Sequence, residues 1–436
     1  MTKAFLTIAI CLLSIGILQF RPVEVKARDY LDLTAEARKI PTAVPYFINK
    51  KDGLSDLTGK KYASILGRSL KFHGFFSIID PDRYAGSQNT DWQALGAEFA
   101  VIGQYEKNAD QIVLEMRLVE ITTGQMVAGK RYRGPEKDSK LMLFKFCDEI
   151  VYKLTGEPGV ALSLIAFVSD NTGKKEIYVS DIIGDEIRQV TKHHSIAVSP
   201  RFTPDGRSLA YTSYHRDNPN LYITELSKTT TRCISWRPGL NLAPAFSPDG
   251  GRMIFTMSNY DGTSDLYLAK ADAPPRKQVE IIGQLTKNSS LNVSPSWSPD
   301  GKKIAFVSDR GGSPQIYIMD LGEKYIRRLT FQGNYNTSPS WSPKGDLIAY
   351  AGSAGGVYEI YTIDASGQSP PTQITKSWGS YESPSWSPDG RQIVFSRKRD
   401  ANQEICAIFK NGNGLRVLFK LPGEQSLPQW SPRLHF

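Results

Sequence analysis

The segment Ser-Pro-Ser-Trp-Ser-Pro-Asp-Gly at residues 294–301 recurs, with small changes, through the C-terminal two-thirds of the chain. The related segments are SPRFTPDG at 199–206, APAFSPDG at 243–250, SPSWSPKG at 338–345, SPSWSPDG at 383–390 and LPQWSP at 427–432. The second prolines of these segments are 44, 51, 44, 45 and 44 residues apart. An internal period of this length predicts a repeat architecture.

Each repeat predicts four short β-strands. The Pro-Asp-Gly triplets are typical of hairpin turns, in which proline presets φ, glycine permits positive φ and aspartates such as Asp249, Asp300 and Asp389 accept bonds from nearby amides. The strand that follows is apolar on both faces, as in Ile304-Ala305-Phe306-Val307. Such a strand must lie between two neighbouring sheets, which predicts a β-propeller.

The two ends of the repeat region predict six blades. Residues 165–168 and 177–178 indicate the second and third strands of a unit that no SPDG segment precedes, whereas LPQWSP at 427–432 is a first strand that no unit follows. We therefore expect the C-terminal strand to complete blade one. Closure of this kind removes the exposed sheet edges of an open array.

Residues 28–156 predict a small α/β domain ahead of the propeller, which itself takes residues 157–436. We expect helices over residues 56–73 and 138–155, a short helix capped by Thr90, and strands over 42–48, 75–79, 99–105, 111–121 and 126–133. In the first helix Leu57, Ile65, Leu66 and Leu70 are expected on one buried face. Ile112, Leu114, Met116 and Leu118 alternate along one strand.

Residues 1–27 are typical of a signal peptide: Lys3, an apolar run over residues 4–20, and the triplet Val25-Lys26-Ala27. Cleavage is expected after Ala27, which would export a mature protein with no membrane span. The alternative is an uncleaved anchor, for which an apolar run broken by Ser14, Gly16 and Gln19 is marginal.

The composition, with 40% hydrophobic and 22% charged residues, excludes disordered and polytopic membrane classes. The net charge of +9 arises from short, dispersed basic clusters, so no nucleic-acid partner is expected. After signal cleavage Cys147, Cys233 and Cys406 remain, an odd number without a C-x-x-C pair, and we expect buried free thiols.

Enzymatic function is the main alternative class. A propeller-bearing hydrolase needs a G-x-S-x-G elbow with an acid and a histidine, and the sequence holds no such elbow. The pair His193-His194 could form half of a metal site, although a solvated loop is the simpler interpretation. A lyase with a metal in the central channel stays open, but no catalytic residue, metal ligand or cofactor is expected.

The motif P-x-W-S-P-D-G-x-x-I-A-F-x-S-D, followed by I-Y-x-x-D, resembles the repeat of TolB-type propellers. The signal peptide, the α/β domain, the junction Leu154-Thr155-Gly156 and six blades ending in Trp430-Ser431-Pro432 together resemble the TolB family of the Tol-Pal system. The segment after Gly156 departs from the usual family pattern, which has a basic residue just before the strand.

The resemblance implies a non-enzymatic adaptor in the periplasm, part of the Tol-Pal complex that also contains TolQ and TolR. Its propeller would bind the lipoprotein Pal, and its N-terminal segment would bind the C-terminal domain of TolA. The implied role is outer-membrane integrity and invagination of that membrane during cell division.

Two sets of candidate binding residues follow. The loops between successive blades differ in every repeat, and we expect them to contact Pal through Leu240, Asn241, Asn292, Tyr335, Trp378 and Tyr381. After cleavage the chain would begin with Arg28, Asp29, Tyr30, Leu31, Asp32 and Leu33, whose alternating pattern suits addition to an exposed sheet edge of TolA. An ordinary edge strand of the α/β domain is an equally good interpretation of these six residues.

Overall fold

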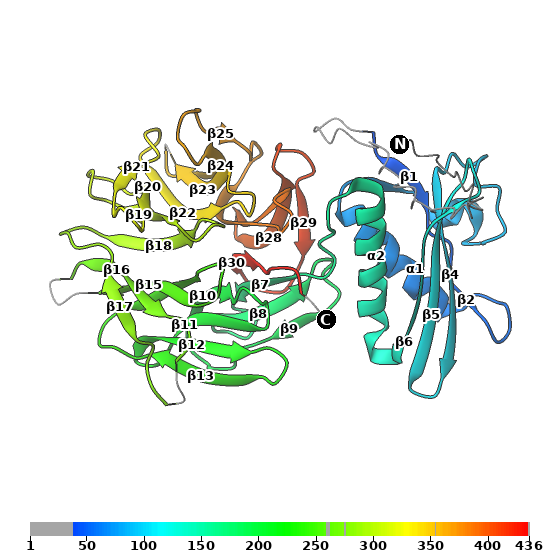
Figure 1. Ribbon diagram of the computed structural model, residues 1–436, viewed down its shortest axis with the longest axis horizontal. Coiled ribbons are helices and arrows are strands. Elements are labelled where there is room, and N and C mark those ends of the chain that lie inside the picture. The colour runs from blue at the N-terminus through cyan, green and yellow to red at the C-terminus, as the bar shows by residue number, and fades with distance from the viewer. Residues whose placement is uncertain (1–37, 259–261, 274–275, 354, 435–436) are drawn as a thin grey trace, which may run out of the picture.

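Six four-stranded antiparallel sheets are arranged around one axis and follow a small α/β domain (Figure 1). The computed structural model describes residues 38–258, 262–273, 276–353 and 355–434. The expected signal peptide, the cleavage site at Ala27 and the segment 28–33 lie outside the described residues.

The α/β domain is built on a mixed sheet of order β3-β1-β4-β5-β6, with β2 added beside β4. Its strands are β1 (Ile40–Ala43), β2 (Ile48–Asn49), β3 (Phe76–Ile78), β4 (Phe99–Asn108), β5 (Gln111–Glu120) and β6 (Met126–Pro135). The alternating residues Ile112, Leu114, Met116 and Leu118 of β5 are all fully buried, as the pattern predicted. The expected strand over 42–48 is instead interrupted, because residues 44–47 lie between β1 and β2.

Two helices, α1 (Leu57–Phe72) and α2 (Ser139–Thr155), pack against each other, and α2 also packs on β5 and β6. The Asp56 side chain caps α1 by accepting a bond from the Gly59 amide, and Gly156 ends α2 at φ 73°. Leu57 is 86% exposed and is not part of the expected buried face, since the first residue of α1 lies before the packed turns. The short helix expected after Thr90 is absent from the described residues, and 3-10 turns η1 (Pro81–Tyr84) and η2 (Glu136–Asp138) occur elsewhere.

Each propeller sheet uses four strands consecutive in sequence except the first, where β30 pairs with β7. The strands are β30 (Gln425–Trp430), β7 (Leu164–Ser169), β8 (Glu176–Asp181) and β9 (Ile187–Gln189) in blade one; β10 (Ala197–Phe202), β11 (Ser208–Arg216), β12 (Asn218–Glu225) and β13 (Thr230–Ser235) in blade two; and β14 (Asn241–Phe246), β15 (Arg252–Ser258), β16 (Ser264–Lys270) and β17 (Ile281–Gln284) in blade three.

The second half of the ring has the same plan. Its strands are β18 (Asn292–Trp297), β19 (Lys303–Ser308), β20 (Gln315–Asp320) and β21 (Ile326–Arg328) in blade four; β22 (Tyr335–Trp341), β23 (Leu347–Ser353), β24 (Tyr358–Asp364) and β25 (Thr372–Gln373) in blade five; and β26 (Ser380–Trp386), β27 (Gln392–Arg399), β28 (Asn402–Phe409) and β29 (Arg416–Phe419) in blade six. The expected six blades and their closure by the C-terminal strand are confirmed.

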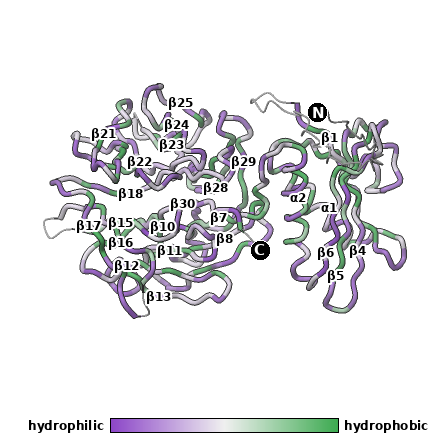
Figure 2. The backbone as a smooth tube through the Cα atoms, in the orientation of Figure 1, coloured by the Kyte–Doolittle hydropathy of each residue, from purple (hydrophilic) through white to green (hydrophobic). Residues whose placement is uncertain are grey.

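The repeated motif serves two purposes, one at the turn and one between blades. At the turn, Asp249 Oδ1 accepts a 3.0 Å bond from the Gly251 amide, and Asp300 and Asp389 make the equivalent bonds. Between blades, the indole N–H groups of Trp297 and Trp386 donate 3.0 Å bonds to backbone carbonyls of the preceding blade. Figure 2 shows hydrophobic stretches along the strands, which these contacts stack face to face.

A β-bulge interrupts every innermost strand. The residue before the first proline of each motif has a positive φ of 49–56°, and the strand register shifts there. These residues are Ser199, Ala243, Ser294, Ser338, Ser383 and Leu427. The bulge leaves one residue without a hydrogen bond to the neighbouring strand. The proline of the motif can occupy that place because it has no amide hydrogen to donate.

Candidate partner-binding face

The loops that join the last strand of one blade to the first strand of the next share one buried framework. Near the start of the loop in four blades, a threonine side chain bonds to the third strand of its own blade. The Thr286 hydroxyl, for example, donates a 2.7 Å bond to Asp265 and accepts a 3.0 Å bond from the Leu266 amide. Thr191, Thr330 and Thr375 make the equivalent pairs with Glu176, Gln315 and Glu359. The loops are therefore anchored at their outer ends.

The inner ends of the same loops are anchored by the residue that stands seven positions before the second proline of each motif, near the start of the innermost strand. Its polar side chain reaches back to a backbone carbonyl four residues earlier in four blades: Asn241 to Arg237 at 2.8 Å, Asn336 to Gln332 at 2.8 Å, Tyr381 to Ser377 at 2.9 Å and Gln425 to Leu421 at 3.0 Å. Asn292 donates instead to Asp265 at 3.0 Å and to the Ser290 carbonyl at 3.1 Å.

These contacts correct part of the predicted Pal site. Asn241, Asn292 and Tyr381 are fully buried, so in this structure their side chains order the loops and are not reached by a partner. Leu240 is half-buried. Tyr335 and Trp378 are 41% and 67% exposed and do lie on the surface. The sequence signal that separates the two groups is the shared position in the repeat, which marks a structural role.

In the loop after blade one, Ala197 stands seven residues before the second proline. Its strand partner Ser213 contacts two histidines, His193 and His215. His193 Nδ1 is 2.7 Å from Ser213 Oγ, which is 3.1 Å from His215 Nδ1, and the two rings are 4.2 Å apart. Burial, with a smaller contribution from His215, lowers the pKa of His193 to about 4. The partner of His193 is thus His215 on β11, and the adjacent His194 is exposed rather than completing a half-site.

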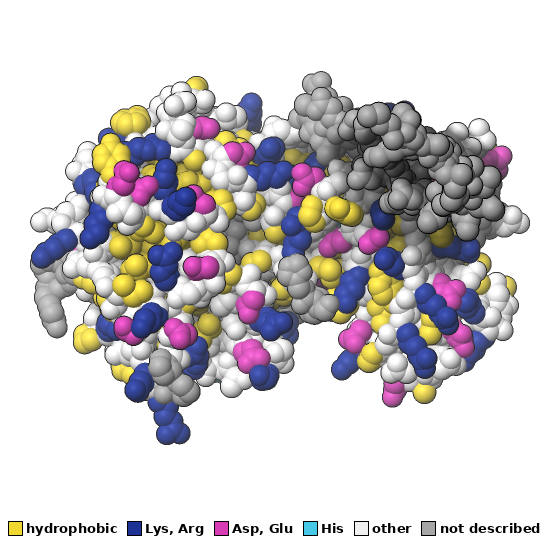
Figure 3. All heavy atoms as spheres, viewed as in Figure 1, with side chains coloured by type: hydrophobic (Ala, Val, Ile, Leu, Met, Phe, Trp, Pro, Cys, Tyr) yellow, Lys and Arg dark blue, Asp and Glu magenta, His cyan; other side chains and the backbone are white. Residues whose placement is uncertain are grey.

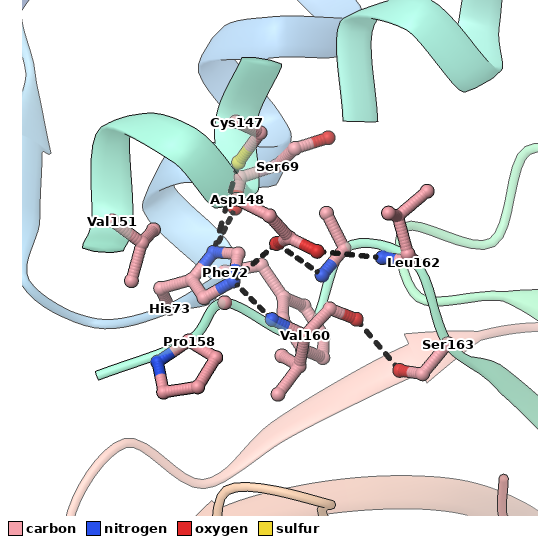
Figure 4. A network of polar contacts seen from close by, with 12 residues as sticks. Ser69, Phe72, His73, Cys147, Asp148, Val151, Pro158, Val160, Leu162 and Ser163 are labelled. Carbon is pink, nitrogen blue, oxygen red and sulfur yellow. Dashed lines mark hydrogen bonds and ion pairs between the residues drawn. The ribbon is translucent and has the colours of Figure 1, made fainter. Parts of the chain in front are cut away.

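One trio of potential metal ligands occurs among the described residues: His73, Cys147 and Asp148 (Figure 4). His73 Nδ1 lies 2.8 Å from the Ser69 carbonyl and therefore carries the hydrogen, while Nε2 accepts a 2.8 Å bond from the Val160 amide. Burial raises the pKa of the Cys147 thiol well above its usual value. With both imidazole nitrogens engaged and the thiol protonated, the trio does not fit a metal ion.

The trio instead holds the connection between the two domains. Asp148 accepts bonds from the Ala161 and Leu162 amides at 2.8 and 3.2 Å, next to the Val160 amide held by His73. These residues come from α1, α2 and the segment that leads into β7. The backbone between domain and propeller is thereby hydrogen-bonded from both helices and cannot act as a free linker.

Further contacts lock the α/β domain onto blades six and one. The Arg391 guanidinium lies 3.7 Å from the Phe75 ring centre, and Arg68 forms two 2.6 Å bonds with Asp185. One apolar core is continuous from the helices into these blades. Beside these contacts a cleft of about 1070 Å³ separates the lobes, lined by charges of both signs including Lys61, Asp110 and Glu186; the hollow between the lobes is visible in Figure 3.

The central channel holds a cavity of about 520 Å³ at the end that carries the Pro-Asp-Gly turns. Its lining is mainly the proline, serine and tryptophan side chains of the repeated motif, and among the described residues only Arg201 and Arg433 contribute charge. The lining residues include none of the carboxylates, thiols or imidazoles that serve as general bases or as zinc ligands. The three cysteines in the described part of the chain are free thiols, with Cys147 and Cys406 buried and Cys233 half-buried. No helix of the described residues combines the length and hydropathy needed to cross a bilayer.

Comparison with known proteins finds a matching family for each of the two lobes. Residues 151–434 match the family of the TolB beta propeller domain, and residues 32–127 match the TolB amino-terminal domain. The chain is similar to the Tol-Pal system protein TolB of Desulfotalea psychrophila, with 44% identity over 66% of this chain, and to that of Desulfosudis oleivorans, with 37% identity over 67%. These matches span 55% and 57% of the two relatives' own lengths.

The structure is similar to the crystal structure of TolB from Acinetobacter baumannii. The TM-score is 0.75 at 27% identity, and the match covers 91% of this chain and 97% of that one. The propeller family accounts for well over half of the chain, and the solved structure has both lobes in the same order. The chain belongs to the TolB family of Tol-Pal system proteins.

Proposed function

We propose that this protein is a non-enzymatic periplasmic adaptor of the Tol-Pal system, which binds Pal through the loops between blades and the C-terminal domain of TolA through residues 28–33. In that role it links the TolA, TolQ and TolR assembly to the outer membrane, maintains the integrity of that membrane and supports its invagination during cell division. Family membership supports the system, and the character of the loops supports the Pal face.

The observation that carries the proposal is the contrast between framework and surface in these loops. A buried hydrogen-bonded framework is repeated from blade to blade, while the exposed tips carry different large side chains such as Tyr335 and Trp378. Rigid loops that present exposed aromatic side chains are typical of interfaces in which a few residues supply most of the binding energy.

We propose a non-enzymatic role because of the chemistry of two sites. The trio at His73 has both imidazole nitrogens occupied, and the channel cavity lacks acid–base groups among the described residues. Neither of these two sites therefore supplies the acid–base groups or free ligand atoms that a hydrolase or a metal-dependent lyase uses.

The direct test is titration calorimetry of the mature protein with the purified soluble domain of Pal from the same bacterium. We expect saturable one-to-one binding that is weakened at least 10-fold by Tyr335→Ala together with Trp378→Ala. The matched control is Tyr325→Ala with Tyr152→Ala, two tyrosines that are also exposed but lie outside these loops. Absence of binding to the wild-type protein, or equal effects of the two double variants, would refute the proposed face.

A further inference from the structure

The position that follows the outer anchor of each inter-blade loop is occupied by lysine in four blades and by an exposed aromatic side chain in two. In all six blades the anchor itself meets an equivalent apolar residue of the third strand through a hydrogen bond or strand pairing. The anchors are Thr191, Ser235, Thr286, Thr330, Thr375 and Phe419, and their partners are Ile177, Leu221, Leu266, Ile316, Ile360 and Ile405. The next residues, in blade order, are Lys192, Trp236, Lys287, Phe331, Lys376 and Lys420.

These six residues, here called the loop ring, are held at equivalent places on one face because their anchors are equivalent. The four lysines are exposed, and none forms an ion pair with a carboxylate of the described residues. Trp236 and Phe331 are 42% and 73% exposed. Both aromatic positions have an arginine beside them: Arg237 follows Trp236, and the Arg328 guanidinium lies 5.0 Å from the Phe331 ring centre.

The loop ring has a strong excess of positive charge. The five-residue segments that begin at its members contain Lys192, Arg237, Lys287, Lys376 and Lys420 as basic residues and Glu424 as the one acidic residue. The five-residue segments that begin at the second proline of each motif, at the opposite face, contain five acidic and six basic residues in the five complete motifs, so their charges nearly balance and the excess is not a general property of the propeller surface. Unpaired cations at regular positions on a rigid face produce a field that extends about 8–10 Å at physiological salt.

We propose that the loop ring steers an acidic protein surface onto this face, so that the Pal surface that docks here carries an excess of Asp and Glu. The inference rests on the proposed function and adds the chemistry of the partner surface and the order of events. The lysines act mainly on the rate of encounter, since exposed charges at the rim of an interface change association more than dissociation. Trp236 and Phe331 act after docking, because desolvated aromatic anchors mainly slow dissociation.

The test is stopped-flow association of the Pal soluble domain with the mature protein at several NaCl concentrations. We expect the wild-type association rate to fall steeply with salt. The fourfold variant Lys192→Ala, Lys287→Ala, Lys376→Ala and Lys420→Ala should associate roughly 10-fold more slowly at low salt and show a shallow salt slope, with a dissociation rate changed less than about threefold. Trp236→Ala with Phe331→Ala should show the reverse pattern.

The matched control removes the same charge from the other domain, through Lys51→Ala, Lys71→Ala, Lys137→Ala and Lys153→Ala, all exposed. An association rate reduced equally in both fourfold variants would overturn the loop ring, because net charge alone would then account for it. Unchanged association of the first variant would also overturn it.

A second arm separates this inference from the proposed function. Poly-L-glutamate is titrated into the wild-type protein and both fourfold variants, with binding read by fluorescence anisotropy of the labelled polymer. Loss of binding in the loop-ring variant alone supports the ring even if Pal fails to bind, a result that would refute the proposed function. Equal binding by all three proteins refutes the ring whatever Pal does.

Discussion

The indole N–H of Trp430, in the last strand, donates a 2.8 Å hydrogen bond to the Ser163 hydroxyl, which stands 267 positions earlier just before the first propeller strand. The Leu164 amide in turn donates a 2.8 Å bond to the Ser431 hydroxyl. The two ends of the propeller are therefore joined by side chains as well as by the β30–β7 ladder. The Trp430 ring also contacts Phe72 of α1, with ring centres 5.9 Å apart, so that one residue joins both ends of the ring and the α/β domain.

Removal of residues 427–436 should abolish cooperative folding of the propeller. The deletion takes most of β30 and leaves β7 as an open edge, which favours aggregation through unpaired backbone groups. Calorimetry combined with light scattering measures the outcome. The milder change Trp430→Phe keeps the ring and removes one hydrogen bond, so it should lower the free energy of unfolding by only about 1 kcal/mol. A deleted protein with the wild-type melting transition would contradict the closed ring.

His73→Ala should destabilise the joint between the domains. The change leaves the buried Val160 amide without its acceptor and removes a buried ring, with an expected loss of about 2–4 kcal/mol in the free energy of unfolding measured in urea. His194→Ala, at an exposed histidine, is the control and should change stability by less than about 0.5 kcal/mol. Added Zn²⁺ or a chelator should leave the wild-type melting temperature unchanged; a clear drop with chelator would mean that the trio holds a metal after all.

Asn292→Ala and Trp378→Ala should separate framework from surface in the predicted Pal site. Loss of the Asn292 amide leaves Asp265 and loop carbonyls short of a donor, so unfolding in urea should become easier by about 1–3 kcal/mol. Trp378→Ala removes an exposed ring and should leave stability within about 0.5 kcal/mol while weakening Pal binding. If Asn292→Ala instead left stability intact and abolished Pal binding, the buried position of Asn292 would not hold in solution.

Stability should rise with pH between about 4 and 6.5 through the histidine pair. The pKa of His193 is about 4 in the folded protein because burial disfavours the charged ring, and burial also lowers the pKa of His215, with Arg216 adding to the effect. The unfolded state, with an ordinary histidine pKa near 6.5, binds more protons in this range, so acidification favours unfolding. Thermal melts from pH 4 to 7 measure this slope. The double variant His193→Gln with His215→Gln should flatten it, and His194→Gln should not.

Removal of residues 28–33 should abolish binding to the TolA C-terminal domain and leave Pal binding intact. A segment that acts as a tether carries little of the folding energy, so the melting temperature should change by no more than a few degrees. Surface plasmon resonance with immobilised TolA and Pal domains measures both interactions on one preparation. A large loss of stability would show that the segment is an ordinary edge strand, and the TolA assignment would then be withdrawn.

The sequence alone was sufficient to predict the elements whose physical cause is local or periodic. The repeat of Pro-Asp-Gly turns and doubly apolar strands required stacked sheets, and the unmatched half-units at the two ends required closure by the last strand. The expected start at residue 56 and end at residue 155 agree with the observed caps Asp56 and Gly156, because capping depends on a few neighbouring residues. Around Thr90 the local pattern failed: residues 92–96 form turns in place of a helix, although Trp92 and Leu95 pack against the cluster that contains Tyr84.

Tertiary structure decided which residues of the variable loops are available to a partner. Asn292 and Trp378 both stand in variable loops and were equally good candidates by sequence. Asn292 is buried among Asp265, Asn288 and Ser290, whereas Trp378 is largely exposed. Burial depends on groups 20 or more positions away in the chain, such as Asp265, so a single loop does not reveal it, and only the recurrence of the same position in every repeat points to a structural role. For the same reason the pairing of His193 with His215, and the joint made by His73, Asp148 and Val160, became visible only when separate segments were brought together by packing.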